Sequence, residues 1–109
     1  MSGLFPDSPG RVVHCRLEAC DIYVGRPTIY GNPYSHLPGK GDYQVATRTE
    51  AISKFADYAR GRMGYDLVFR AAVLRCYGKT LGCWCAPEAC HAWVLLRLAD
   101  EWINASKNQ

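Results

Sequence analysis

Three cysteines and one histidine gather in a short stretch near the C-terminal end of the chain. Residues 82–91 read Gly-Cys-Trp-Cys-Ala-Pro-Glu-Ala-Cys-His. Thiolates are nucleophiles and soft metal ligands, and an imidazole can act as their base or as a further ligand. A buried strand is expected to end at Cys83–Cys85, and Pro87 is typical of the first residue of a helix. Because helix N-termini carry free N–H groups and a partial positive charge, this turn favours the thiolate form of its cysteines.

We expect this turn to act in catalysis or ligand binding. Its candidate catalytic residues are Cys85, Cys90, His91 and Cys83. Cys90 and His91 are neighbours within the first turn of the expected helix and would not face each other. His91 is therefore expected to pair with Cys85 or Cys83.

Two other uses of the same four residues stay open. In the first, the three cysteines hold a structural zinc ion together with His91, or with a cysteine from elsewhere such as Cys15 or Cys76, because zinc takes four such ligands in a tetrahedron. The Cys-x-Cys-x4-Cys spacing looks like the small zinc knot that follows methyltransferase SET domains, whereas the usual local zinc signature is Cys-x2-4-Cys. In the second, the cysteines pack as small hydrophobic residues, and His91 is a buried histidine with satisfied hydrogen bonds.

A long loop expected over residues 25–41, with four glycines and three prolines, is the second segment that could bind a ligand. The planar fork of Arg26 suits phosphate or carboxylate, and the amide of Asn32 suits the edge of a base. Tyr30 or Tyr34 could stack on that base. The candidate ligand-binding residues, with Arg48 from the next helix and His14 from the first strand, are Gly25, Arg26, Gly31, Asn32, Tyr30, Arg48 and His14. His14 belongs to this set if its strand neighbours the strand over residues 81–85.

The elements that position these residues are expected to form one small α/β domain with a compact sheet and helices packed on it. Strands are expected over residues 11–15, 21–25 and 79–85, and helices over 47–61, 65–77 and 87–104. Thr47 and Glu50 form a capping box at the start of the first helix, and Gly61 and Gly64 are expected to end it. Residues 1–10 are expected to form a loose arm, and residues 11–105 the domain.

Composition excludes some classes of protein and favours others. The chain has 109 residues, of which 49% are hydrophobic, and a net charge of +3. No apolar run approaches the ~20 residues of a membrane span, so we expect no membrane partner. The N-terminal residues lack the pattern of a secretory signal, which favours a cytoplasmic protein with reduced cysteines. The small charge gives only weak support to nucleic acid as a partner.

The motifs Gly-Arg-x4-Gly-Asn-Pro at residues 25–33 and Gly-Cys-Trp-Cys-x-Pro-x2-Cys-His at residues 82–91 carry a resemblance. From about residue 11 to 98 the chain resembles a small domain-of-unknown-function family common in bacteriophages. That family usually has Trp where this chain has Tyr30, and Cys20 and Cys76 lie outside its pattern and are expected to pack. A second uncharacterised family is similar only at Cys85, Cys90 and His91.

The resemblance implies a phage origin, and therefore the cytoplasm of a host cell. Small enzymes of nucleotide and DNA modification are frequent in phages, so we expect an enzyme or binding domain for a nucleotide, nucleoside or nucleobase; which of the two stays open. The first alternative is a zinc-stabilised domain without catalysis. The second is a phage protein that binds and modulates a host protein through exposed residues such as Trp93 or Trp102.

Overall fold

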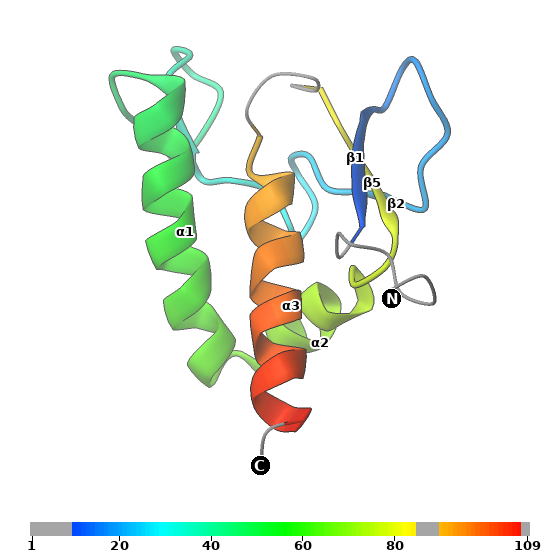
Figure 1. The fold of residues 1–109 in the computed structure, drawn as a ribbon. Helices are drawn as coiled ribbons and strands as arrows, with labels where there is room; N and C mark the ends of the chain where they lie inside the picture. The colour runs from blue at the N-terminus through cyan, green and yellow to red at the C-terminus, as the bar shows by residue number, and fades with distance from the viewer. Residues whose placement is uncertain (1–9, 85–89, 108–109) are drawn as a thin grey trace.

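The computed structural model describes residues 10–84 and 90–107, and the expected arm over residues 1–10 lies almost wholly outside them. The chain forms a mixed α/β domain, which confirms the expected fold class (Figure 1). Its strands are β1 (Arg11–His14), β2 (Ile22–Tyr23), β3 (Tyr34–Ser35), β4 (Tyr43–Gln44) and β5 (Thr80–Cys83). Its helices are α1 (Arg48–Tyr65), α2 (Leu67–Arg75) and α3 (Ala92–Lys107).

Strand β5 is the centre of a three-stranded parallel sheet in the order β1-β5-β2. In the register of the sheet, His14 lies opposite Cys83, and Tyr23 lies opposite Gly82. A Cβ on Gly82 would lie only 2.5 Å from the Sγ of Cys20, so glycine is needed for the close approach of that cysteine to β5. Because the three strands are parallel, their carboxyl ends meet at one edge of the sheet.

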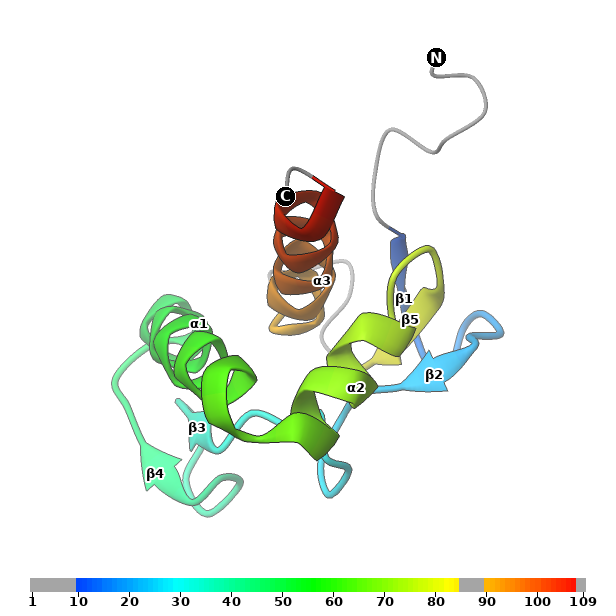
Figure 2. The ribbon, with the colours of Figure 1, turned by 90° about the horizontal axis from the view of Figure 1, so that it is seen from below.

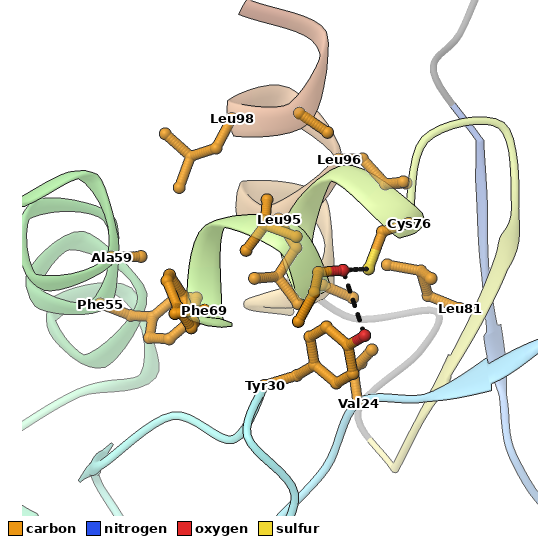
Figure 3. Packing of buried hydrophobic residues seen from close by; sticks show 14 of the residues in the cluster. Val24, Tyr30, Phe55, Ala59, Phe69, Cys76, Leu81, Leu95, Leu96 and Leu98 are labelled. Carbon is orange, nitrogen blue, oxygen red and sulfur yellow. Dashed lines mark hydrogen bonds between the residues drawn. The ribbon is translucent and has the colours of Figure 1, made fainter. Parts of the chain in front are cut away.

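The helices cover the sheet on one side and build the core between them. Figure 2 shows α2 and α3 next to the sheet, with α1 further out beside β3. The largest fully buried side chains come from α1, α2, β5 and α3, and they include Phe55, Phe69, Leu81, Leu95 and Leu96 (Figure 3). Burial of each such side chain stabilises the fold by about 2 kcal/mol relative to its exposure.

Helix α1 does not end at Gly61 or Gly64, so that expectation is wrong. It continues to Tyr65, and both glycines lie on its exposed side. Asp66 marks the boundary instead. Its backbone N–H donates to the carbonyl oxygen of Arg62, and its side chain accepts from the N–H of Phe69 at the start of α2. The expected cap at the other end is confirmed, since Thr47 Oγ1 accepts from the N–H of Glu50 at 3.0 Å.

Two further boundaries differ from expectation. Helix α3 begins at Ala92, so Cys90 and His91 precede the helix rather than lie in its first turn. Pro87, expected as the first helical residue, lies outside the described residues. The segment expected to be loop over residues 25–41 contains β3, which pairs in parallel with β4 through Tyr34 opposite Tyr43.

In Figure 1, α1 and α3 begin at the end of the molecule at which β5 ends. Two helix N-termini therefore lie on the same side as the carboxyl ends of the sheet. None of the described helices is both long and apolar enough to cross a membrane.

Candidate functional site

A cavity of about 510 Å³ lies at the edge of the sheet where β2 and β5 end. It is lined by residues from five segments, namely 23–26, 32–40, 48–52, 83–84 and 90–91. One wall is the beginning of α1, and residues 83–84 and 90–91 form another part of the lining. Ligands of parallel α/β sheets commonly bind at this edge, beyond the carboxyl ends of the strands.

His91 is held in a defined orientation at this cavity. Its Nε2 lies 2.8 Å from the carbonyl oxygen of Val24, which follows β2. A carbonyl oxygen can only accept a hydrogen bond, so Nε2 carries the proton and donates it. The ring also packs edge-on against Phe55 of α1, with 5.1 Å between ring centroids. In the neutral ring, Nδ1 is then the basic nitrogen.

Cys90 lies beside that basic nitrogen, with its Sγ 3.7 Å from Nδ1 of His91. The expectation that these neighbours would not face each other is wrong. It assumed that both residues were helical, whereas both precede α3. The Sγ of Cys90 also accepts from the backbone N–H of Ala92 at 3.5 Å, as a cap on the first turn of the helix.

Cys83 completes this cluster from the end of β5. Its Sγ lies 2.8 Å from the Sγ of Cys90, and both side chains are buried and line the cavity. Cys85, the fourth candidate catalytic residue, lies outside the described residues. The structure thus brings Cys83, Cys90 and His91 together.

The zinc alternative involves the same four residues. In the part of the chain that the structure describes, no group of three or more His, Cys, Asp or Glu side chains is arranged to hold a metal ion. This statement does not cover Cys85, one of the expected zinc ligands, because Cys85 lies outside the described residues. Outside this cluster, the described thiols of Cys15, Cys20 and Cys76 are free cysteines.

Arg26 lies on the cavity and is positioned by the loop around it. Its Nη1 donates to the carbonyl oxygen of Asn32 at 2.5 Å. A Cβ on Gly31 would lie 2.9 Å from Cγ of Arg26, so Gly31 supports the site without lining the cavity. Gly25 does line it, and a Cβ there would meet the hydroxyl of Tyr23.

Asn32 lines the cavity, but its amide is already engaged within the protein. Its Nδ2 donates to the carbonyl oxygen of Ala51 at 3.1 Å, and its Oδ1 accepts from the N–H of Tyr34 at 2.8 Å. The bond to Ala51 ties the loop to the first turn of α1. Arg48 stands on that same turn and also lines the cavity, so Asn32 links the segments that carry the two arginines.

Two candidate residues lie away from the cavity. Tyr30 points into the core beneath α2, where its hydroxyl donates to the carbonyl oxygen of Ala72 at 3.1 Å (Figure 3). Tyr34 is therefore the aromatic residue of the two that lines the cavity. His14 does neighbour β5, but its ring contacts Trp84 edge-on, with centroids 5.7 Å apart, and does not line the cavity.

Several lining residues escaped the sequence analysis, among them Tyr23, His36, Lys40 and Trp84. Trp84 is half-exposed, and its Nε1 donates to the hydroxyl of Tyr23 at 2.7 Å. A signal existed for both, because each stands at the carboxyl end of a strand that was expected. Lys40 lies within the loop over residues 25–41, whose fold brings it back to the cavity.

Burial makes one other cysteine a useful contrast. Cys76 follows α2, and its Sγ lies 3.6 Å from the carbonyl oxygen of Ala72. Burial raises the pKa of this thiol from 9.0 to about 11, so it is protonated at neutral pH.

Trp93 and Trp102, expected to be exposed, are exposed, and Trp102 lies against the guanidinium of Arg70 at 4.5 Å.

Comparison with known proteins gives a lineage. The profile of a family described as a domain of unknown function (DUF4326) matches residues 11–101. Because that match spans most of the chain, the protein belongs to this family. No curated protein and no solved structure matches the chain. The chemistry of the cavity must therefore carry any argument about function.

Proposed function

We propose that the cavity binds an anionic nucleotide, or a nucleoside or nucleobase like it. The domain would be a small enzyme or a binding domain that acts on this ligand with its cysteine-histidine turn. The observation that carries the proposal is the shared location of three cationic side chains, Arg26, Lys40 and Arg48, with Cys90 and His91 around one cavity.

The charge of the cavity favours an anion. Arg26 and Arg48 offer planar forks that match phosphate oxygens, and Lys40 adds a point charge. Among the lining residues in the described part of the chain, none carries a carboxylate. Arg48 is also the first residue of α1, where the helix dipole adds partial positive charge.

Size and aromatic content favour a planar organic ligand over a bare ion. The volume of about 510 Å³ falls in the range of small-molecule sites, roughly 300 to 1,000 Å³. Tyr23, Tyr34 and Trp84 line the cavity and could stack against a base. A nucleoside phosphate combines the charge and the plane that these side chains would recognise.

Thermal shift and calorimetry with three groups of probes test this proposal. These are the common nucleoside monophosphates, the matching nucleosides, and inorganic phosphate. We expect a monophosphate to raise the midpoint of thermal unfolding and to bind more tightly than its nucleoside. Lys40→Gln and Arg48→Gln should each weaken that binding about tenfold, since hydrogen bonds between charged groups contribute roughly 1.5 to 3 kcal/mol.

Arg97→Gln is the matched control, because Arg97 is exposed on α3 and does not line the cavity. Lys40 is exposed, so its variant is not expected to disturb the fold. If no member of the panel binds, or if the Arg97 variant loses as much affinity as the cavity variants, the proposal is wrong. Near-stoichiometric zinc in the purified protein would favour the zinc-stabilised alternative, and retention of one host protein in a pull-down would favour the other.

We also infer that the protein is encoded by a bacteriophage and works in the cytoplasm of the host. The two motifs at residues 25–33 and 82–91, which resemble those of a phage-common family, support the origin. The free thiols of Cys15, Cys20 and Cys76 support a reducing compartment. Fractionation of infected cells is expected to recover the protein with cytoplasmic markers.

A further inference from the structure

We propose that Cys90 is the nucleophile of this cavity and that His91 is its base, so that the site reacts with anionic electrophiles. This inference rests on the proposed function, because the anion is expected to bind at the cationic side chains of the same cavity. It assigns separate roles within a turn where the sequence alone favoured Cys85 and Cys83 as the partners of His91.

The hydrogen bonds of His91 decide which of its two ring nitrogens can act as a base. The bond from Nε2 to the carbonyl oxygen of Val24 commits the proton of the neutral ring to Nε2. Nδ1 can then accept, and the Sγ of Cys90 lies 3.7 Å from it. Nucleophile and base often stand slightly apart in the empty site and approach when the ligand binds. Val24 is thus the group that orients the base.

Hydrogen-bond donors surround the sulfur of Cys90 and would stabilise its thiolate. The Sγ of Cys90 lies 2.8 Å from the Sγ of Cys83 and 3.5 Å from the backbone N–H of Ala92. Either thiol of the pair can donate to the other sulfur. When Cys90 gives its proton to His91, the thiol of Cys83, the N–H of Ala92 and the imidazolium can all donate to the resulting thiolate. Such donors lower the pKa of a cysteine and stabilise its anion.

The reaction balances with no further reagent. The proton of Cys90 moves to Nδ1 of His91, and the electron pair of sulfur forms a bond to the electrophilic atom of the ligand. The bond from that atom to its leaving group breaks, and its electron pair departs with the leaving group. The leaving group then takes the proton from Nδ1. A water molecule can then attack the same atom and give a proton to Nδ1 of His91. The bond from that atom to sulfur breaks, its electron pair returns to the sulfur, and the proton passes from Nδ1 to Cys90 as the second product leaves.

Alkylation by two matched reagents tests this assignment on the full chain. Iodoacetamide and iodoacetate have the same reactive carbon and the same leaving group, but only iodoacetate is an anion. In each case the sulfur–carbon bond forms as iodide leaves. We expect Cys90 to react first with both reagents, and Cys76 to react last. The cavity should raise the rate with iodoacetate relative to iodoacetamide at Cys90, and Arg48→Gln should remove that preference.

His91→Gln separates a base from a merely structural residue. General bases contribute roughly a hundredfold or more, so this variant should slow the alkylation of Cys90 about a hundredfold near pH 7. The rate should recover at high pH, where the thiol ionises without help. Cys83, Cys85 and Cys90 fall on one tryptic peptide between Lys79 and Arg97, so fragment spectra must locate the label.

The outcomes distinguish the two proposals. A fast Cys90 in a protein that binds no member of the nucleotide panel supports the reactive pair and contradicts the proposed function. A bound nucleotide together with a slow Cys90 does the reverse. If His91→Gln fails to fold, the pH profile of the unaltered protein decides. A profile that follows a single ordinary thiol, or a first label on Cys83, would overturn the assignment.

Discussion

The guanidinium of Arg26 and the backbone of Asn32 form one unit, because Nη1 donates to the carbonyl oxygen of Asn32 at 2.5 Å. The neighbouring glycines make room for this contact. A Cβ on Gly31 would lie 2.9 Å from Cγ of Arg26, and a Cβ on Gly41 would lie 3.2 Å from its Nη1. Gly31 and Gly41 thus leave the space that the side chain of Arg26 occupies at the cavity, which is a more specific role than flexibility.

Replacement of Arg26 tests whether that position serves ligand binding. Arg26→Lys keeps the charge but loses the planar fork, so the affinity for a nucleoside monophosphate should fall about tenfold. Because Arg26 is exposed, the free energy of unfolding should change by less than about 0.5 kcal/mol. Calorimetry and urea denaturation measure the two effects. An unchanged affinity would remove Arg26 from the site.

Gly31→Ala moves the same arginine without altering its chemistry. The new methyl group would stand closer to Arg26 than packing allows, so the side chain must shift. We expect a loss of affinity like that of Arg26→Lys, together with about 1 to 3 kcal/mol of destabilisation from overpacking. Affinity measured on the folded fraction isolates the first effect. If the Gly31→Ala variant bound the ligand with unchanged affinity, the observed position of Arg26 would not be required for binding.

Helix α1 offers the matched control. Gly61 and Gly64 lie inside the helix on its exposed side, and a Cβ on either would meet nothing within 4 Å. Alanine loses less backbone entropy than glycine when a helix forms. Gly61→Ala and Gly64→Ala should therefore each stabilise the protein by roughly 0.5 to 1 kcal/mol, as urea denaturation would show, and leave ligand affinity unchanged. If either substitution destabilised the protein, the placement of Gly61 and Gly64 inside α1 on its exposed side would be wrong.

Those two glycines also show what local sequence can and cannot predict. The capping box at Thr47 was predictable because it needs only residues a few positions apart. The end of α1 was not, because its packing against α2, α3 and β3 carries the helix past both glycines. The β3–β4 pair was missed for a similar reason. Each strand has two residues, too few for any alternating pattern.

The candidate site divides along the same line. The rule that ligands bind beyond the carboxyl ends of parallel strands was enough to bring Arg26 and His91 to one place. The inward direction of Tyr30 depends on the backbone of the loop, which no periodicity describes. The contact between Cys90 and His91 depends on whether α3 starts before or after them. The helix starts at Ala92, a few residues later than expected, and this start lets the side chains of Cys90 and His91 approach each other.

Burial of Cys76 predicts a loss of stability at alkaline pH. The thiol has a pKa of about 11 in the folded protein against an ordinary value of 9.0. Below pH 9 it is neutral in both states, and the difference contributes nothing. Between pH 9 and 11 the unfolded chain releases its proton first, so the free energy of unfolding falls as pH rises, by up to about 3 kcal/mol.

Urea denaturation across that range checks the effect of Cys76. Cys76→Ala should lower the stability at pH 7, because it leaves a cavity, but it should flatten the decline above pH 9. Tyr30, whose pKa burial also raises, adds a decline of the same sign at higher pH. A variant that declines as steeply as the parent protein would assign the effect to other groups.

Removal of metal separates a reactive turn from a structural one. We expect Cys85, which lies outside the described residues, to alkylate faster than Cys76, because burial keeps the thiol of Cys76 protonated at neutral pH. Cys85→Ser should keep the fold and abolish ligand binding or activity. In the parent protein, a chelator should change neither the midpoint of unfolding nor the rate at which Cys85 is labelled. Were Cys85 instead a zinc ligand with Cys83, Cys90 and His91, the serine variant would lose much of the folding energy that the metal supplies, and chelation would unfold the parent protein. Labelling that is slow until a chelator is added would establish the zinc site and end the case for a nucleophile.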